Sequence, residues 1–566
     1  MKRTSFYSSI VFFGIVALFA TSCAKLKPLS QSNFTVTPSP LETVGKNVPG
    51  TVSATFPEKW FNKNAIVTIT PVLKFDGNRE VTATPYSYQG ENISGNRTPV
   101  SYTTGGNVTL NFNILYRPEM QSSELYVRFD GKIKNKKAQL PDIKVADGII
   151  ATSTLASVRT TAPSIADDGF QRVIKQAQDA NIHFVIQQAN LRSTELNKED
   201  MTTWKQRVQQ AFNDPKQNVN VEVSAYASPD GGVSLNEKLA AEREKNTSEY
   251  LEKELKKRNI NTDINARYTA QDWEGFRKLV ETSNLQDKEL ILRVLEMYPD
   301  SETREREIKN ISIVYDDLAS TILPQLRRSR ITANIDIIGK SDEEILSFWK
   351  NTPNNLTVEE LLYASTLTSD KKEKERIYQF VTNRFPQDYR GWNNLGALFF
   401  TEGSMDKAKQ AFDRAAQVKP DAPEVNMNKA LLAMMNNDTE TAKELLGKAP
   451  NANALEGAMG VFYLMEGEYN QAVRAFGDTK SNNAALAHLL TKDYNTALNT
   501  LENVSNADAT TSYLAAIIAS RTNNFNDVVM NLRSAIALDR FMANKALHDL
   551  EFAKYRNNPE FMSLLK

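Results

Sequence analysis

Pairs of small and large residues four positions apart recur through the C-terminal part of the chain, and this periodicity constrains the fold more than any other feature of the sequence. The pairs are Ala408 and Phe412, Ala442 and Leu446, Ala472 and Phe476, Ala497 and Leu501, and Val528 and Leu532. A spacing of four places both members on one helical face, where the small residue lets a second helix approach and the large one fills the gap. The pattern therefore predicts stacked helix pairs, with irregular spacing in the middle of the stack.

The most complete unit of this pattern lies between residues 390 and 420, and its diagnostic residues are Trp392, Leu395, Gly396, Phe399, Ala408, Phe412, Ala415 and Pro420. This unit resembles the tetratricopeptide repeat. The resemblance implies a helical solenoid over residues 345–566, whose concave face is built from the first helix of each pair and holds a protein partner. Its candidate groove residues are Arg390, Asn393, Ala397 and Phe400, and the alternative is that these side chains are simply solvated.

The N-terminus carries the pattern of an export signal. Lys2 and Arg3 precede an apolar run over residues 10–20, and small residues then lead into Cys23. Because the run is short for a transmembrane helix, we expect residues 1–22 to be a signal peptide outside the fold.

Cys23 is the single cysteine of the 566-residue chain, so an intramolecular disulfide is impossible. Its position resembles the lipobox of bacterial lipoproteins, although Ala20 stands where that pattern usually has Leu. The resemblance implies that Cys23 carries acyl chains and attaches the protein to a membrane. The alternative is an ordinary signal peptide that is cleaved nearby and leaves a free thiol.

The next two regions differ sharply in composition. Residues 23–50 are rich in Ser, Thr, Pro and Lys, which predicts a flexible tether. Residues 51–165 contain short runs in which apolar and polar residues alternate, with turn residues between them, and this pattern predicts an N-terminal β-sandwich. No motif in the sandwich carries chemistry, so we expect it to be a spacer or a docking surface.

Strand and helix patterns alternate over residues 166–340. We expect strands at residues 183–186, 219–226, 264–268 and 330–338, and helices at residues 198–212 and 234–258. This order predicts an α+β domain with a mixed sheet and helices on one face. A helical insertion is expected at about residues 271–327, because helical patterns recur there at 272–280, 288–297 and 313–326.

The second of these helices carries a specific motif, formed by Asn236, Leu239, Ala240, Arg243, Glu244, Thr247 and Leu251. Their spacing resembles the helix motif of the OmpA-like peptidoglycan-associated domain, in the enlarged form of lipoproteins from the Bacteroidetes. The resemblance implies that Arg243 binds the carboxylate of diaminopimelate in a cell-wall peptide, for which a guanidinium fork is well shaped.

The loop before this helix departs from the family. It reads Ala-Ser-Pro-Asp-Gly, so Ser228 stands where the family has an Asp that binds the ligand's ammonium group, and Asp230 is the nearest replacement. The candidate peptidoglycan-binding residues are therefore Ser228, Asp230, Asn236, Leu239 and Arg243. The alternative is that Arg243 forms a surface ion pair with Glu244 or another carboxylate, which would contribute little to stability.

Composition and pattern give no support to catalysis. The 68 acidic and 68 basic residues leave no net charge to draw the chain onto nucleic acid. The three histidines, His183, His488 and His548, are far apart in sequence, so we expect no metal site, no imidazole-based catalytic triad and no cofactor. Adjacent carboxylates at 316–317 and 343–344 fit solvated helices, and a glycan hydrolase is a distant alternative.

The preferred hypothesis is a non-enzymatic scaffold of the cell envelope. It is an outer-membrane lipoprotein on the periplasmic face that binds peptidoglycan through the OmpA-like domain and a protein partner through the repeats. In the alternative hypothesis, the OmpA-like domain does not bind the wall and is a protein-protein module in a secretion or surface-assembly complex. The partner's identity and the oligomeric state stay open.

Overall fold

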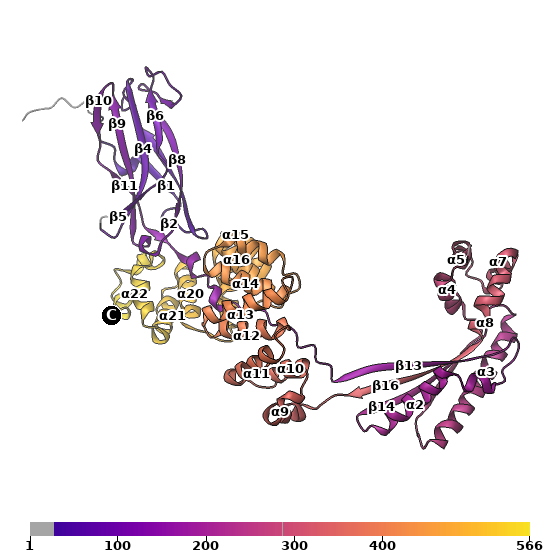
Figure 1. The fold of residues 1–566 in the computed structure, drawn as a ribbon. Coiled ribbons are helices and arrows are strands. Elements are labelled where there is room, and N and C mark those ends of the chain that lie inside the picture. Colours follow the sequence, from indigo (N-terminus) through magenta and orange to yellow (C-terminus); the bar gives the residue numbers. More distant parts are fainter. Residues whose placement is uncertain (1–25, 27, 78, 286) are drawn as a thin grey trace, which may run out of the picture. The chain divides into compact units, whose positions relative to one another are not determined.

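The computed structural model describes residues 26, 28–77, 79–285 and 287–566, so Cys23 and the segment 1–22 that we expect to be a signal peptide lie outside the described residues. Two compact units are present (Figure 1). Unit 1 combines the chain up to residue 167 with residues 378–566, and unit 2 is residues 168–377. In sequence, unit 2 is therefore an insertion between the two parts of unit 1. Within the described ranges, no helix has the length and apolar character needed to cross a membrane.

The N-terminal part of unit 1 is built from two sheets that pack face to face. The first sheet has the order β1 (Phe34–Thr37), β3 (Asn47–Phe56), β8 (Gly106–Leu115). The second has the order β10 (Lys136–Gln139), β9 (Ser123–Ile133), β4 (Ala65–Phe75), β6 (Tyr86–Gly90), β7 (Thr98–Val100), with β5 (Arg79–Thr82) on β4 and β11 (Ile143–Asp147) on β9.

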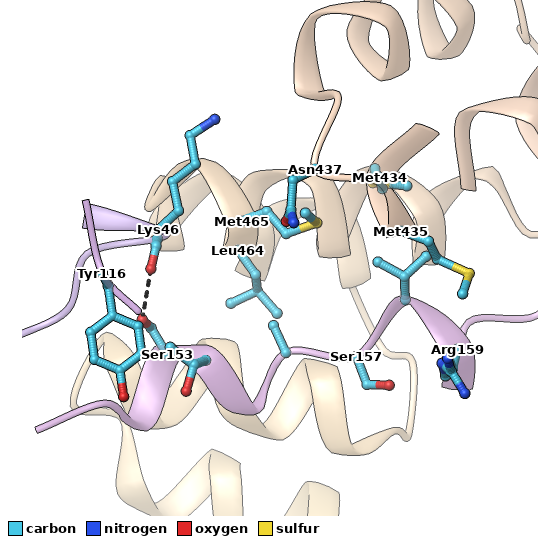
Figure 2. A pocket seen from close by; sticks show the side chains of 14 residues that line it. Lys46, Tyr116, Ser153, Ser157, Arg159, Met434, Met435, Asn437, Leu464 and Met465 are labelled. Atoms are coloured by element: carbon cyan, nitrogen blue, oxygen red, sulfur yellow. Dashed lines mark hydrogen bonds between the residues drawn. The ribbon is translucent and has the colours of Figure 1, made fainter. Parts of the chain in front are cut away.

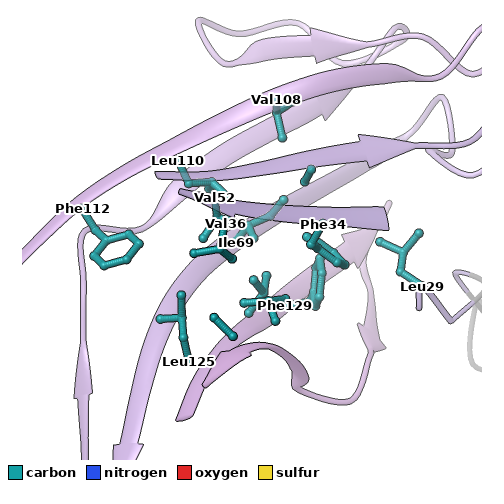
Figure 3. Packing of buried hydrophobic residues seen from close by; sticks show 14 of the residues in the cluster. Leu29, Phe34, Val36, Val52, Ile69, Val108, Leu110, Phe112, Leu125 and Phe129 are labelled. Atoms are coloured by element: carbon teal, nitrogen blue, oxygen red, sulfur yellow. The ribbon is translucent and has the colours of Figure 1, made fainter. Parts of the chain in front are cut away.

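The core of this sheet-rich part lies between the two sheets (Figure 3). Val52 and Leu110 from the first sheet share one buried cluster with Ile69 and Phe129 from the second. In β4 and β9, buried residues alternate with more exposed ones, which is the pattern of strands covered on one face.

The expectation of a flexible tether over residues 23–50 is wrong for the described part of that segment. Residues 34–50 contribute β1, the short β2 (Leu41–Glu42) and the start of β3. Phe34, Val36 and Leu41 are buried in the core. The alternation Phe-Thr-Val-Thr is a strand pattern, and the surrounding Ser and Pro residues hid it at the level of composition.

The C-terminal part of unit 1 is a run of helix pairs, as the residue periodicity predicted. The pairs are α12 (Tyr389–Thr401) with α13 (Met405–Val418), α14 (Pro423–Met435) with α15 (Thr439–Gly447), α16 (Leu455–Glu466) with α17 (Tyr469–Phe476), α18 (Asn482–Leu490) with α19 (Tyr494–Glu502), and α20 (Ala509–Arg521) with α21 (Phe525–Leu538). The small residues of the repeating pairs are fully buried where these helices meet. Helices α22 (Phe541–His548) and α23 (Pro559–Leu564) follow, with the 3-10 helix η7 (Leu550–Tyr555) between them.

Unit 2 contains a four-stranded mixed sheet of order β13, β16, β14, β15. Along the chain the elements are β13 (Val173–His183), α1 (Ser193–Leu196), α2 (Glu199–Asn213), β14 (Gln217–Tyr226), α3 (Val233–Lys257), β15 (Ile264–Thr269), an insertion, and β16 (Arg328–Ile338). Only β14 and β15 are parallel. Trp204 and Val208 of α2 and Leu251 of α3 pack with Val223 and Ile331 in one core.

The first strand of unit 2 was predicted in the wrong place. The sequence favoured residues 183–186, whereas β13 ends at His183. Most of β13 is exposed, and its polar residues show no apolar alternation that would reveal a strand. The strand forms because its backbone pairs with β16 along its whole length, and its side chains give no sign of this pairing.

The insertion before β16 is helical, as predicted, and has its own core. It consists of α4 (Trp273–Thr282), α5 (Lys288–Met297), α6 (Ser301–Asn310), α7 (Ser312–Asp317), a π-helical turn η5 (Leu318–Ile322) and α8 (Leu323–Leu326). Phe276, Ile291 and Leu318 are buried together. Helix α6 was not predicted, because its strongly charged sequence buries only Ile308. Unit 2 continues into α9 (Asp342–Asn351) and α10 (Val358–Thr366), and α11 (Lys371–Arg384) spans the boundary with unit 1.

Close packing at Gly460 yields a test of the helix pairing. A methyl group on Gly460 would lie 2.4–2.6 Å from ring carbons of Phe476, which is buried against α16. We expect Gly460→Ala to destabilise the repeat region by about 1–3 kcal/mol in denaturant unfolding followed by circular dichroism. Gly447→Ala is the control, because no atom lies within 4 Å of its added methyl group. Equal unfolding midpoints for both variants would contradict this packing.

Candidate functional site

An extended segment, residues 151–167, links the last strand of the sheet-rich part, β12 (Ile149–Ile150), to unit 2. Within unit 1 it lies against first helices of the repeats, and it includes the 3-10 helices η3 (Thr152–Leu155) and η4 (Val158–Thr160). We call residues 151–167 the linking segment. Ser153, Ser164 and Ala166 of this segment are buried, so their amide and carbonyl groups need hydrogen-bond partners from the protein.

Asparagine side chains of the repeat helices supply these partners. The Asn428 amide accepts a hydrogen bond from the Ser164 N–H at 2.7 Å and donates one to the Ser164 carbonyl at 2.8 Å. Asn393 donates to the same carbonyl at 3.0 Å and accepts from Asn428 at 2.9 Å. Because both asparagines and Ser164 are buried, these bonds form away from bulk water.

The same two-way contact recurs on either side of Ser164. Asn394 accepts from the Ala166 N–H at 2.8 Å and donates to the Ala166 carbonyl at 3.0 Å. Asn483 makes the equivalent pair of bonds with Ser157, at 2.9 and 2.8 Å. We call Asn393, Asn394, Asn428 and Asn483 the asparagine clamp. A carboxamide has one acceptor oxygen and two N–H donors, so it can bond to both the N–H and the carbonyl of one residue, as a neighbouring strand does.

The N-terminal end of the linking segment is fixed by an ion pair. Arg521 of α20 donates to Glu551 at 2.6 Å, and both side chains are largely buried. The Thr152 hydroxyl donates to the same carboxylate. Ser153 bonds to the Thr43 hydroxyl at 2.7 Å, which ties the segment to the sheet-rich part as well.

The structure corrects the expectation of an open partner groove at Arg390, Asn393, Ala397 and Phe400. Asn393 contacts the protein's own linking segment, and Ala397 and Phe400 are buried. Arg390 pairs with Asp388 at 2.7 Å. Sequence reasoning missed Asn394, Asn428 and Asn483. The available signal was the recurrence of Asn in first helices, with Asn394 and Asn428 at equivalent positions of successive repeats.

The five residues predicted to bind peptidoglycan meet around one small cavity in unit 2. Ser228, Asp230, Asn236, Leu239 and Arg243 all line a space of about 40 Å³. A cavity needs roughly 10–15 Å³ of such space to hold one water molecule, so this one has room for a few waters.

Arg243 does not present a free guanidinium fork to this cavity. The side chain is 1% exposed, and its nitrogens donate to the carbonyls of Gln188 at 3.0 Å, Tyr226 at 2.9 Å and Val185 at 3.4 Å. The guanidinium also stacks over the Phe184 ring at 5.0 Å. Burial lowers the pKa of Arg243 to about 10, so it stays charged at neutral pH. The surface ion pair considered as the alternative is therefore also wrong.

The loop carboxylate is occupied as well. Asp230 pairs with Arg327 at 2.8 Å, and Arg327 also donates to the Ser228 hydroxyl at 3.2 Å. Asn236 donates to the carbonyls of Ser228 and Gly231, which fixes the loop against α3. Arg327 sits at the end of the helical insertion, outside the family motif, so motif reading did not find it.

His183 and Glu344, two of the remaining candidates for chemistry, have structural partners. Burial lowers the pKa of His183, whose ring lies 3.5 Å from Glu195. Glu344 caps α9 and pairs with Lys216 at 2.9 Å. Among the described residues, no group of histidine, cysteine and carboxylate side chains is arranged to hold a metal ion.

Comparison with known proteins identifies the repeat. Residues 389–422 match the tetratricopeptide repeat family. The chain is similar to a tetratricopeptide repeat protein from Parabacteroides merdae ATCC 43184, at 14% identity over 40% of this chain and 89% of that one, with a TM-score of 0.28. It is also similar to PilW, a type IV pilus biogenesis factor, at 15% identity over 40% and 96%, with a TM-score of 0.26. No curated protein matches the chain.

The asparagine clamp predicts a local effect of Asn428→Ala. The change removes the sole hydrogen-bond acceptor described for the Ser164 N–H, which lies in a buried site. We expect the variant to lose about 1–3 kcal/mol of stability and its Ser164 amide to exchange hydrogen faster, as measured by exchange mass spectrometry. Asn531→Ala is the control, because Asn531 bonds only within its own helix, to the Asp527 carbonyl. Unchanged protection of the linking segment in Asn428→Ala would argue against the clamp.

Proposed function

We propose that this protein is a non-enzymatic scaffold of the cell envelope, anchored by acyl chains on Cys23. Its repeat region holds the protein's own linking segment. The asparagine clamp carries the proposal, because it uses the first helices of the repeats to hold an extended peptide, which is the kind of binding expected of a scaffold. We place the protein on the periplasmic face of the outer membrane, a location consistent with export of the chain.

The clamp makes the linking segment an integral part of the repeat region. Its three two-way contacts address main-chain atoms, so they depend little on the side chains at Ser157, Ser164 and Ala166. Asn394 thus fixes the main chain at Ala166, two residues before unit 2 begins. A protein partner must then dock on a surface other than the clamped part of the groove.

For unit 2 we propose an OmpA-like domain that docks a protein and does not capture wall peptide. Arg243 is saturated by backbone carbonyls, and Asp230 is neutralised by Arg327. Binding a diaminopimelate group would require both to give up these partners in a buried site, where an unpaired charge is costly.

Peptidoglycan binding is the second candidate function, and one observation favours it. All five residues of the candidate site line the same cavity, beside a helix whose motif resembles wall-binding domains. A wall peptide would have to displace Arg327 before it could reach Asp230 and Arg243.

Sedimentation with purified peptidoglycan separates these two functions of unit 2. We expect wild type and Asp230→Asn to remain in the supernatant to the same extent as without peptidoglycan, because the carboxylate is already paired. Glu237→Gln, at an exposed position of α3, is the matched control. Retention of wild type and Glu237→Gln, with loss of retention in Asp230→Asn, would establish wall binding instead.

Cell fractionation tests the anchor. We expect Cys23→Ser to move the protein from the membrane fraction to the soluble fraction, because several acyl chains give lasting attachment and the rest of the chain has no described spanning helix. Protease treatment of intact cells should leave the membrane-bound wild type uncut if it faces the periplasm. A variant that stays in the membrane fraction would contradict lipid attachment at this residue.

A further inference from the structure

A cavity of about 430 Å³ opens in unit 1 beside the linking segment. Three parts of the chain line it: the turn between β2 and β3 together with Tyr116, residues 153–159 of the linking segment, and the C-terminal ends of α14 and α16 (Figure 2). Its volume falls within the range of roughly 300–1,000 Å³ that is usual for ligand pockets. The cavity is separate from the clamp asparagines and from the Arg243 site.

One wall of the cavity is apolar and adaptable. Met434, Met435, Leu464 and Met465 lie at the ends of the two repeat helices, and Val158 of the linking segment also lines the cavity. Met435 and Met465 are only half-buried, because they border the open space. Thioether side chains fit apolar groups of varied shape, so this wall suits an aliphatic or aromatic side chain from outside.

The two charged side chains that line the cavity are both cationic. Lys46 and Arg159 are the charged residues that line it, and no carboxylate does so. Both are exposed, and no carboxylate of the described chain lies within ion-pair distance of Arg159. Lys46 has only a contact of 4.0 Å with Glu466 and a hydrogen bond to Thr439 at 3.3 Å. A ligand with negative charge is therefore complementary to this rim.

The walls are fixed before any ligand arrives. Gly45 has a φ of +56°, and its N–H donates to the Tyr469 hydroxyl at 3.1 Å. That hydroxyl donates in turn to the Thr43 carbonyl at 3.3 Å, and the Tyr116 N–H donates to the Lys46 carbonyl at 2.9 Å. On the opposite wall, the clamp holds Ser157. A preformed cavity reduces the entropy that binding must overcome.

We propose that this cavity is a docking site for an acidic peptide segment of a partner protein. One large apolar side chain of the peptide enters among the methionines, and carboxylates on either side of it meet Lys46 and Arg159. The proposal rests on the scaffold function above and assigns to it a docking surface that the occupied groove cannot provide.

Selection from a random peptide display library tests this site directly. The full chain is immobilised, and the library is first depleted on Met465→Glu, which puts a negative charge into the apolar wall. We expect the enriched peptides to share an aromatic or aliphatic residue flanked by Asp or Glu. In fluorescence anisotropy, the best of them should bind Arg159→Glu and Met465→Glu at least about tenfold more weakly than wild type, and its affinity should fall as salt rises.

Met530→Glu is the matched control, because Met530 is 56% exposed on α21 and does not line the cavity. Its affinity for the peptide should equal that of wild type, and thermal melting should show that all variants are folded. No enrichment after depletion, enrichment of basic peptides, or equal binding by Met465→Glu and Met530→Glu would overturn the proposal. The assay needs neither the lipid anchor nor peptidoglycan, so its result is independent of the tests of the proposed function.

Discussion

The need to satisfy buried main-chain groups governs the architecture of unit 1. The linking segment has no neighbouring strand along most of its length, and an unpaired amide or carbonyl in such a site costs about 1–3 kcal/mol. Asn428, Asn394 and Asn483 each return two hydrogen bonds to one residue of the segment. The first helices of the repeats thereby satisfy the main chain of an extended peptide at Ser157, Ser164 and Ala166, as neighbouring strands do in a sheet.

The need to pair buried polar groups also explains why Arg243, although it lies in a motif that resembles a ligand-binding one, has no free guanidinium. A buried guanidinium must be compensated, and here the carbonyls of Gln188, Tyr226 and Val185 do so. Arg327 then takes the carboxylate that would have completed a ligand site. The guanidinium of Arg243 and the carboxylate of Asp230 are thus both already bonded within the protein. The presence of motif residues at the right spacing is therefore not enough to establish that a ligand can enter.

Features with local periodicity could be predicted from the sequence, whereas features that depend on distant partners could not. Pairs such as Ala472 and Phe476 predict their helices, because the small and the large residue lie on one helical face. Strand β13 was predicted in the wrong place, since pairing with β16 gives it order that its composition does not show, whereas the strand at Phe34 has a local alternation that the surrounding Ser and Pro residues hid. The clamp asparagines and Arg327 were not predicted, because their hydrogen-bond partners are distant in sequence. Asn428 reaches a residue 264 positions away, and Arg327 reaches one 97 positions away.

The discontinuity of unit 1 has a consequence during biosynthesis. A chain made from its N-terminus presents the linking segment and the whole of unit 2 before Asn394, Asn428 and Asn483 exist. Until the ribosome has finished the repeats, the main-chain groups of Ser157, Ser164 and Ala166 can bond only to water or to a temporary binding protein. Contacts of such long sequence separation also form slowly. Unit 1 can therefore close only after the last third of the chain has been made, and a truncated chain exposes a peptide backbone that the complete chain buries.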